Sequence, residues 1–157
     1  MSRVERTPSP WIIAIAVTAA IATNLAIRTI GGLAGGSFAF TAETGPAVVD
    51  HLTVAGFTLV PLSIGLALVA LLGRWWGGVF TDAMIVAPLL EFGSILGMTL
   101  PADFDLVSKI ALAACHLALI PITIVAIAAL RARRRARQRA ADAASAASVQ
   151  PELISGA

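Results

Sequence analysis

Long apolar runs separated by short polar stretches dominate this chain. Runs of about twenty or more mostly apolar residues recur along it. A helix rises 1.5 Å per residue, so about twenty residues cross a hydrocarbon core of about 30 Å. The pattern therefore predicts membrane-spanning helices over residues 11–30, 51–72, 79–100 and 106–130.

The polar segments between these runs differ in length and predict different connections. Residues 31–49 are rich in glycine and then polar, which predicts a flexible or re-entrant loop. Residues 73–78 and 101–105 are short, so the last three helices are expected to be antiparallel neighbours. The expected fold class is all-α, an integral membrane four-helix bundle.

The two ends of the chain flank this transmembrane domain of residues 11–130. Residues 1–10 are short and polar, and their basic character with Ala20-x-Ala22 also fits a cleaved signal peptide. The apolar run continues past Ala22, beyond the ~7–15 residues of a signal core, so a retained helix is favoured. Residues 131–157 are expected to extend the fourth helix and then to fray and become disordered.

Composition agrees with a membrane protein. Hydrophobic residues make up 58% of the chain and charged residues 13%, against about 25% charged in soluble domains. Cys115 is the lone cysteine and the two histidines are far apart, so neither a disulfide nor a dedicated metal site is expected. The glycines of residues 31–36 are not followed by the Lys-Ser/Thr of a phosphate-binding loop, and no cofactor is expected.

Basic residues gather on one side of the predicted bundle. They are Arg3, Arg6, Arg74 and the arginines of Arg131–Arg139. The positive-inside rule then places both termini in the cytoplasm of a multi-pass protein of the cell membrane. Trp11, Trp75 and Trp76 lie on the same side, where aromatic rings favour the headgroup level.

The run Arg131–Arg139 also predicts a partner. Each arginine near the surface of an anionic membrane contributes about 1 kcal/mol of attraction. Charge alone would also allow nucleic acid to bind. Because the run directly follows a predicted span, we expect anionic lipid headgroups and no nucleic acid.

Two ionisable residues are predicted at about the same depth in the membrane. Glu91 lies ~11 residues into the third run and His116 ~10 residues into the fourth, from opposite sides, so both reach about the midplane. A Glu91–His116 pair could share a proton, as in proton relays. The favoured alternative is a neutral Glu91 that hydrogen-bonds His116, Ser94 or a backbone carbonyl.

Another polar cluster is expected at the outer end of the bundle. Asn24 and Arg28 are one turn apart on the first helix and share a face. Residues expected at that level are Asp50, His51, Asp103, Asp105 and Lys109. One interpretation is an outward-facing vestibule that binds an ion or a headgroup; the favoured one is interfacial anchoring with local ion pairs.

Prolines and glycines interrupt the predicted spans. Pro61, Pro88 and Pro121 each remove an amide donor and free the carbonyl four residues earlier, which predicts helix kinks. Membrane helices tolerate proline, so the kinks need not be functional. Gly93 and Gly97 permit close helix approach, and we expect them to pack inside the bundle.

The segments ACHLALIPITI and FTLVPLSIGLALVALLGRWW carry a resemblance. They resemble spans of a family of small four-helix bacterial membrane proteins, domain of unknown function 6069. Asn24, His116, Pro121 and the glycines of residues 31–36 are the matching positions, and the resemblance covers about residues 11–130. It implies a fold and a membrane location, supplies no activity, and does not include Glu91.

These features favour a non-enzymatic accessory or partner-binding subunit of a membrane assembly. Its helix faces would contact another membrane protein or a second copy of the chain. The alternative is a small transporter, channel or proton-coupled component that uses Glu91 and His116. An enzyme acting on a lipid or quinone has less support, because no nucleophile–base constellation is visible.

Overall fold

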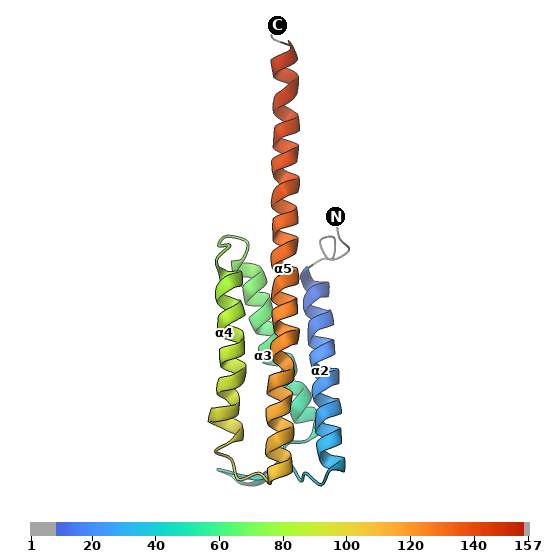
Figure 1. Cartoon of the computed structure of the whole chain (residues 1–157), viewed down its shortest axis with the longest axis vertical. Helices are drawn as coiled ribbons and strands as arrows, with labels where there is room; N and C mark the ends of the chain where they lie inside the picture. Colours follow the sequence, from blue (N-terminus) through green and yellow to red (C-terminus); the bar gives the residue numbers. More distant parts are fainter. Residues whose placement is uncertain (1–8, 156–157) are drawn as a thin grey trace.

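Four long helices form the molecule (Figure 1). The computed structural model describes residues 9–155, and side chains are described for residues 9–146. The helices are α2, Ser9–Leu33; α3, His51–Leu72; α4, Val79–Ser94; and α5, Leu106–Ser155. All four are long and apolar enough to cross a membrane, α4 together with the turn that follows it. Residues 1–8, with Arg3 and Arg6, lie outside the described part.

The all-α expectation is confirmed, and α5 is the central element. It packs along α2 on one side and along α4 on the other, while α3 packs mainly against α2 (Figure 1). The consecutive helices α3 and α4 touch each other little. Large parts of α3 and α4 therefore face outward with apolar side chains, as a membrane helix requires.

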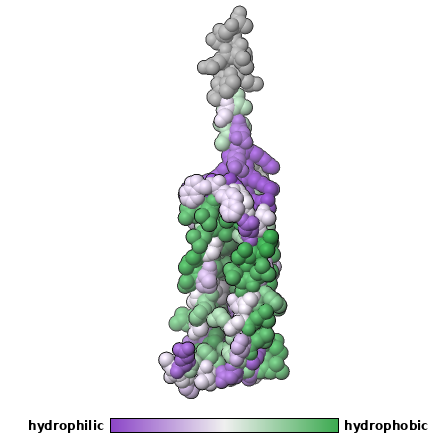
Figure 2. All heavy atoms as spheres, turned by 90° about the vertical axis from the view of Figure 1, so that its left-hand side faces the viewer, coloured by the Kyte–Doolittle hydropathy of each residue, from purple (hydrophilic) through white to green (hydrophobic). Residues whose placement is uncertain are grey.

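The two ends of the bundle differ in chemistry. The arginine end carries Arg74 and the arginines of residues 131–139, and α5 projects from it. The opposite end, here the hairpin end, carries the connections at residues 34–50 and 100–105. Figure 2 shows apolar surface along the helices, bounded by hydrophilic atoms where α5 leaves the bundle.

The largest apolar core lies toward the arginine end. Residues from all four helices meet there, and the buried members are Ile12, Ala16, Leu66, Val79, Phe80, Ala126, Ile127 and Leu130. Further toward the hairpin end, α2 and α5 approach closely through small residues. A Cβ placed on Gly31 would lie 2.7 Å from the Cβ of Ala111, so only glycine fits there without a shift.

The loop predicted over residues 31–49 is more ordered than expected. α2 continues to Leu33, and an antiparallel hairpin follows, with β1, Ala39–Ala42, paired to β2, Gly45–Val48. Gly45 adopts φ 120°, which favours glycine and allows a two-residue turn at Glu43 and Thr44. Phe38, with φ 56°, precedes β1 and is completely buried against the end of the bundle.

The tail also differs from the prediction. α5 runs without interruption to Ser155, whereas fraying and disorder were expected after the arginines. Ala, Arg and Gln, which dominate residues 131–147, are among the strongest helix formers and carry the helix beyond the bundle. The last two residues and all side chains after 146 lie outside the described part.

None of the three prolines ends a helix. α3 is continuous through Pro61, α4 through Pro88 and α5 through Pro121. The irregular turn lies elsewhere, at Ile95–Thr99, where the chain forms a π-helical turn and the Leu100 amide donates to the Ile95 carbonyl at 2.9 Å. This turn closes the third membrane-spanning segment.

Candidate functional site

The carboxylate singled out from the sequence lies between α4 and α5. The hydroxyl of Thr123, which is buried on α5, donates to Glu91 Oε1 at 2.7 Å. Glu91 is half-buried, and its second oxygen, Oε2, is buried without a hydrogen-bond partner among the described residues. This oxygen therefore lacks the stabilisation that a hydrogen bond gives to a buried polar atom.

The predicted Glu91–His116 pair is not formed. Thr123 occupies the position facing Glu91, and His116 lies about two turns, or ~10 Å, further along α5 toward the hairpin end. Counting from the expected span ends misjudged the offset between the two helices. Glu91 lies eight residues before the end of the π-helical turn at Thr99, whereas Thr123 lies 17 residues after the start of α5 at Leu106. α5 therefore begins further toward the hairpin end than the third segment ends (Figure 1).

A second buried polar contact joins α2, α3 and α5. The Asn24 amide donates to Thr58 Oγ1 at 2.9 Å, and Thr58 in turn donates to the Val54 carbonyl. The Cys115 thiol donates to the backbone oxygen of Asn24 at 3.6 Å. Asn24 Oδ1 is buried without a partner in the described part of the chain. Asn24 therefore ties helices together and is not part of a surface cluster.

The predicted outer cluster is used to hold the hairpin segment in place. The guanidinium of Arg28 lies 4.4 Å from the centre of the Phe38 ring, and its Nε donates to the Val49 carbonyl at 3.4 Å. His51 Nε2 lies 3.2 Å from the hydroxyl of Thr29. Cation–π contact and backbone hydrogen bonding together anchor residues 38–49 on α2.

Two further members of that cluster act at helix ends. Asp50 is the N-cap of α3, and its Oδ1 accepts from the Thr53 amide at 2.7 Å. The Thr53 hydroxyl donates to the same oxygen, and the two hydrogen bonds hold the pKa of Asp50 below its ordinary value. Lys109 donates to the Leu100 carbonyl at 3.0 Å and so satisfies the end of the π-helical turn.

Asp103 and Asp105 tie the hairpin segment to the start of α5. Asp103 accepts from the Thr41 amide at 2.8 Å and its hydroxyl at 2.7 Å, which lowers the Asp103 pKa. Asp105 accepts from the hydroxyl and amide of Ser108, and from those of Ser37, and these bonds hold its pKa well below the usual range. Apart from Asn24, the residues proposed for a vestibule hold the hairpin segment and the neighbouring helix ends in place, and we call residues 37–49 with these contacts the hairpin cap.

Gly93 and Gly97 were expected to pack inside the bundle, and this prediction is wrong. Both are exposed, and a Cβ on either would meet no atom within 4 Å. Ile95 and Thr99, which alternate with them, are the buried residues of this turn. The helix therefore presents its glycines outward, on the same segment that carries Glu91.

Several partners in these contacts had not been singled out from the sequence. Thr123, Thr58 and Phe38 are apolar-run or loop residues with no local signal. The caps did have one, because an Asp three residues before Thr53 or Ser108, at the start of an apolar run, is the N-cap pattern. No cluster of three or more potential metal ligands occurs among the residues that the structure describes.

The fold and these contacts define a multi-pass membrane protein, a bundle of four apolar helices with a hairpin cap at one end and arginines at the other. Residues 5–136 match the family of unknown function DUF6069, and since this range covers most of the chain, the protein belongs to that family. No curated protein and no solved structure matches it.

Proposed function

We propose that this protein is a non-enzymatic subunit of an assembly in the cell membrane, and that α4 with its π-helical turn binds a transmembrane helix of a partner. The observation that carries the proposal is the open face at Gly93 and Gly97. The two glycines are one turn apart, and nothing in the described part of the chain packs on them. Two glycines in a helix weaken it by about 1 kcal/mol each relative to alanine, and no contact among the described residues explains that cost.

A helix surface of this kind fits association in lipid. Apolar side chains alone give little driving force between helices in a membrane, so close backbone approach at small residues becomes decisive. Phe92, Leu96 and Met98 are exposed beside the glycines and would form the walls of the contact. The π-helical turn overlaps Gly97, and such turns are frequent at functional sites.

The proposed orientation places both termini in the cytoplasm. It rests on the arginines at one end of the bundle and on the positive-inside rule. Trp75 and Trp76 lie at that end and are 73% and 59% exposed, which suits the headgroup level.

The test is native mass spectrometry of the tagged full chain, purified from its own membrane in a mild detergent. We expect a stoichiometric complex with a second membrane protein or a second copy. Replacing both glycines, Gly93→Leu and Gly97→Leu, should dissociate it, because leucine side chains separate the backbones. Gly65→Leu is the matched control, since Gly65 on α3 is also surrounded by open space. A lone monomer in every detergent contradicts the proposal.

One observation favours a second candidate, a proton-coupled membrane component. Glu91 Oε2 is buried without a partner among the residues that the structure describes, and ionisable groups at this depth occur in proton relays. Glu91→Gln should then abolish a pH-driven flux into liposomes, while His116→Ala leaves it intact because His116 lies about two turns from Thr123. Equal flux in wild type, Glu91→Gln and protein-free liposomes excludes this candidate.

A further inference from the structure

A pocket opens at the arginine end of the bundle, beside the apolar core and away from the polar contacts described above. Its volume is about 680 Å³, and it lies between the start of α2, the end of α3 and the part of α5 that leaves the bundle. The floor is apolar, and its larger residues are Ile13, Leu71, Phe80 and Leu130. We call this site the arginine pocket.

Four arginines give the pocket its charge. Arg74 comes from the turn after α3, and Arg133, Arg134 and Arg137 come from α5. No aspartate or glutamate lines the pocket, and no ion pair neutralises these arginines among the described residues. Four arginines lining a pocket with an apolar floor create a strongly positive potential beside apolar surface.

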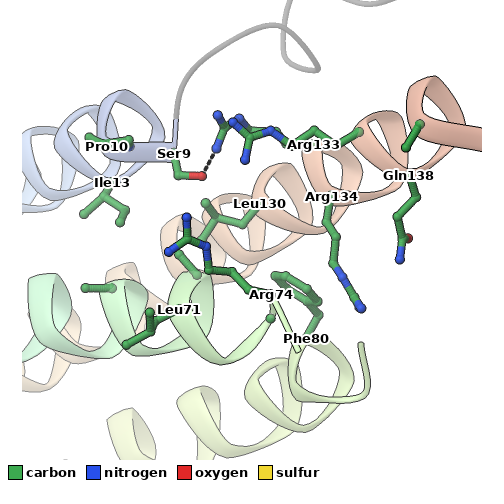
Figure 3. A pocket seen from close by; sticks show the side chains of 15 residues that line it. Ser9, Pro10, Ile13, Leu71, Arg74, Phe80, Leu130, Arg133, Arg134 and Gln138 are labelled. Carbon is green, nitrogen blue, oxygen red and sulfur yellow. Dashed lines mark hydrogen bonds between the residues drawn. The ribbon is translucent and has the colours of Figure 1, made fainter. Parts of the chain in front are cut away.

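Two of the arginines extend toward the same helix terminus (Figure 3). The side chains of Arg74 and Arg133 both extend toward the start of α2, and Arg133 Nη1 donates to the hydroxyl of Ser9. α2 begins at Ser9, so its helix dipole adds positive potential at the same place. Guanidinium groups bind carboxylate and phosphate oxygens in a bidentate manner, and phosphate is the group that phospholipids present at headgroup level.

The pocket continues into an apolar groove. A second hollow of about 520 Å³ runs between α2 and α3, and it shares Pro10, Ile13 and Ala67 with the arginine pocket. It follows α2 as far as Ile21, which is ~16 Å from Pro10 along the helix. The residues that line this groove lie within the candidate membrane spans of α2 and α3.

The combination of the two hollows identifies one ligand class. A phosphate site at the end of an apolar helix bundle lies at headgroup level, and the groove that leaves it can receive a hydrocarbon chain. We propose that the arginine pocket and the adjoining groove bind one anionic phospholipid of the bilayer. Its phosphate is held between Arg74 and Arg133, and one acyl chain lies along the groove.

The experiment is a lipid titration of the full-length protein, delipidated in detergent and followed by native mass spectrometry. The probes are dioleoyl phosphatidylglycerol, dioleoyl phosphatidylcholine and inorganic phosphate. We expect one phosphatidylglycerol to bind about ten-fold more tightly than phosphatidylcholine, and we expect inorganic phosphate not to compete at millimolar concentration. Equal binding of both lipids overturns the proposal. Displacement of phosphatidylglycerol by millimolar inorganic phosphate overturns it as well.

Variants separate a defined site from general attraction to a basic helix. Replacing the pocket arginines of α5, Arg133→Gln, Arg134→Gln and Arg137→Gln, should abolish the preference for phosphatidylglycerol. The single variant Arg137→Gln leaves the Arg133–Ser9 contact in place and should reduce the preference for phosphatidylglycerol. It replaces the triple variant if that variant does not fold. Retention of the full preference in a folded pocket variant overturns the proposal.

The matched control removes the same charge from the same helix outside the pocket. Arg131→Gln, Arg135→Gln and Arg139→Gln change residues that do not line it, and this variant should retain the preference. Equal loss in both triple variants would show attraction to the basic helix as a whole and overturn the site. Ser63→Phe fills the groove without touching the pocket, and it should weaken phosphatidylglycerol binding as well.

Discussion

At the scale of the residue, buried polar groups in this protein depend on partners that lie far away in the chain. Asn24 donates a hydrogen bond to Thr58, and Glu91 accepts one from Thr123. In each case one polar atom remains without a partner in the described part, Asn24 Oδ1 and Glu91 Oε2. Polar groups inside a membrane bundle are costly when unpaired, so these contacts hold specific helix pairs together.

The Glu91–Thr123 contact leads to a stability prediction. Thr123→Val keeps the shape of the side chain and leaves both oxygens of Glu91 without a partner. We expect unfolding in sodium dodecyl sulfate to require about 1–3 kcal/mol less free energy. The double variant Glu91→Leu with Thr123→Val should recover much of the loss, because both partners are then apolar. An unchanged unfolding curve for Thr123→Val would contradict the contact.

At the scale of the element, close helix approach and the hairpin cap decide the arrangement. α2 and α5 meet at Gly31 and Ala111, and Phe38 closes the same end from the hairpin segment. The cap is held mainly by aspartates that accept hydrogen bonds from threonine and serine. The first contact is steric and insensitive to pH, whereas the second depends on charge.

The steric contact predicts that replacing glycine by alanine changes stability in opposite directions at Gly31 and at Gly65. Gly31→Ala brings a Cβ to 2.7 Å from Ala111 and 2.9 Å from the Phe38 ring, so overpacking should lower stability by about 1–3 kcal/mol. Gly65→Ala meets nothing within 4 Å and should raise stability by up to about 1 kcal/mol through helix propensity. Unfolding in sodium dodecyl sulfate measures both, and stabilisation by Gly31→Ala would contradict the close approach.

The charged contacts predict that the cap loosens in acid. The pKa values of Asp103 and Asp105 are lowered in the fold, so their contribution is fully present above the unfolded value of about 3.9. It is lost as the pH falls below about 4 toward the folded values. A spin label at Thr44→Cys should become more mobile in that range. Asp103→Asn with Asp105→Asn should raise its mobility at pH 7, and equal mobility would contradict the role.

At the scale of the whole molecule, the two ends of the bundle differ in structure and in charge. The hairpin end is closed by the cap, and the arginine end holds the open pocket with its four arginines. α4 adds a third surface, with exposed glycines and apolar neighbours. A partner helix on α4 and a lipid between α2 and α3 would occupy separate sides of the bundle.

The orientation of the whole molecule can be measured directly. Ala42→Cys lies in the hairpin and should react with an impermeant maleimide from outside intact cells. Ser145→Cys lies on the projecting part of α5 and should react after lysis only, because the positive-inside rule places the arginines in the cytoplasm. Cys115 is buried and serves as the internal background. The reverse labelling pattern would contradict the proposed orientation.

The sequence by itself determined the number, type and approximate bounds of the helices. Each apolar run must satisfy its own backbone hydrogen bonds in lipid, and a helix does so within the segment. The second run, residues 51–72, coincides with α3 for this reason, and the N-caps at Asp50 and Asp105 are local patterns of the same kind. The order of the runs also determined that Arg74 and the arginines of residues 131–139 lie at the same end, because both follow an even number of spans.

Only the tertiary structure decided which side chains meet. The partner of Glu91 depends on the axial offset between α4 and α5. The lengths of the two apolar runs do not determine this offset. The same holds for the face on which Gly93 and Gly97 lie, and for Phe38, which is buried because a hairpin folds back over α2. Contacts between segments arise from packing in three dimensions, and a one-dimensional pattern does not contain them.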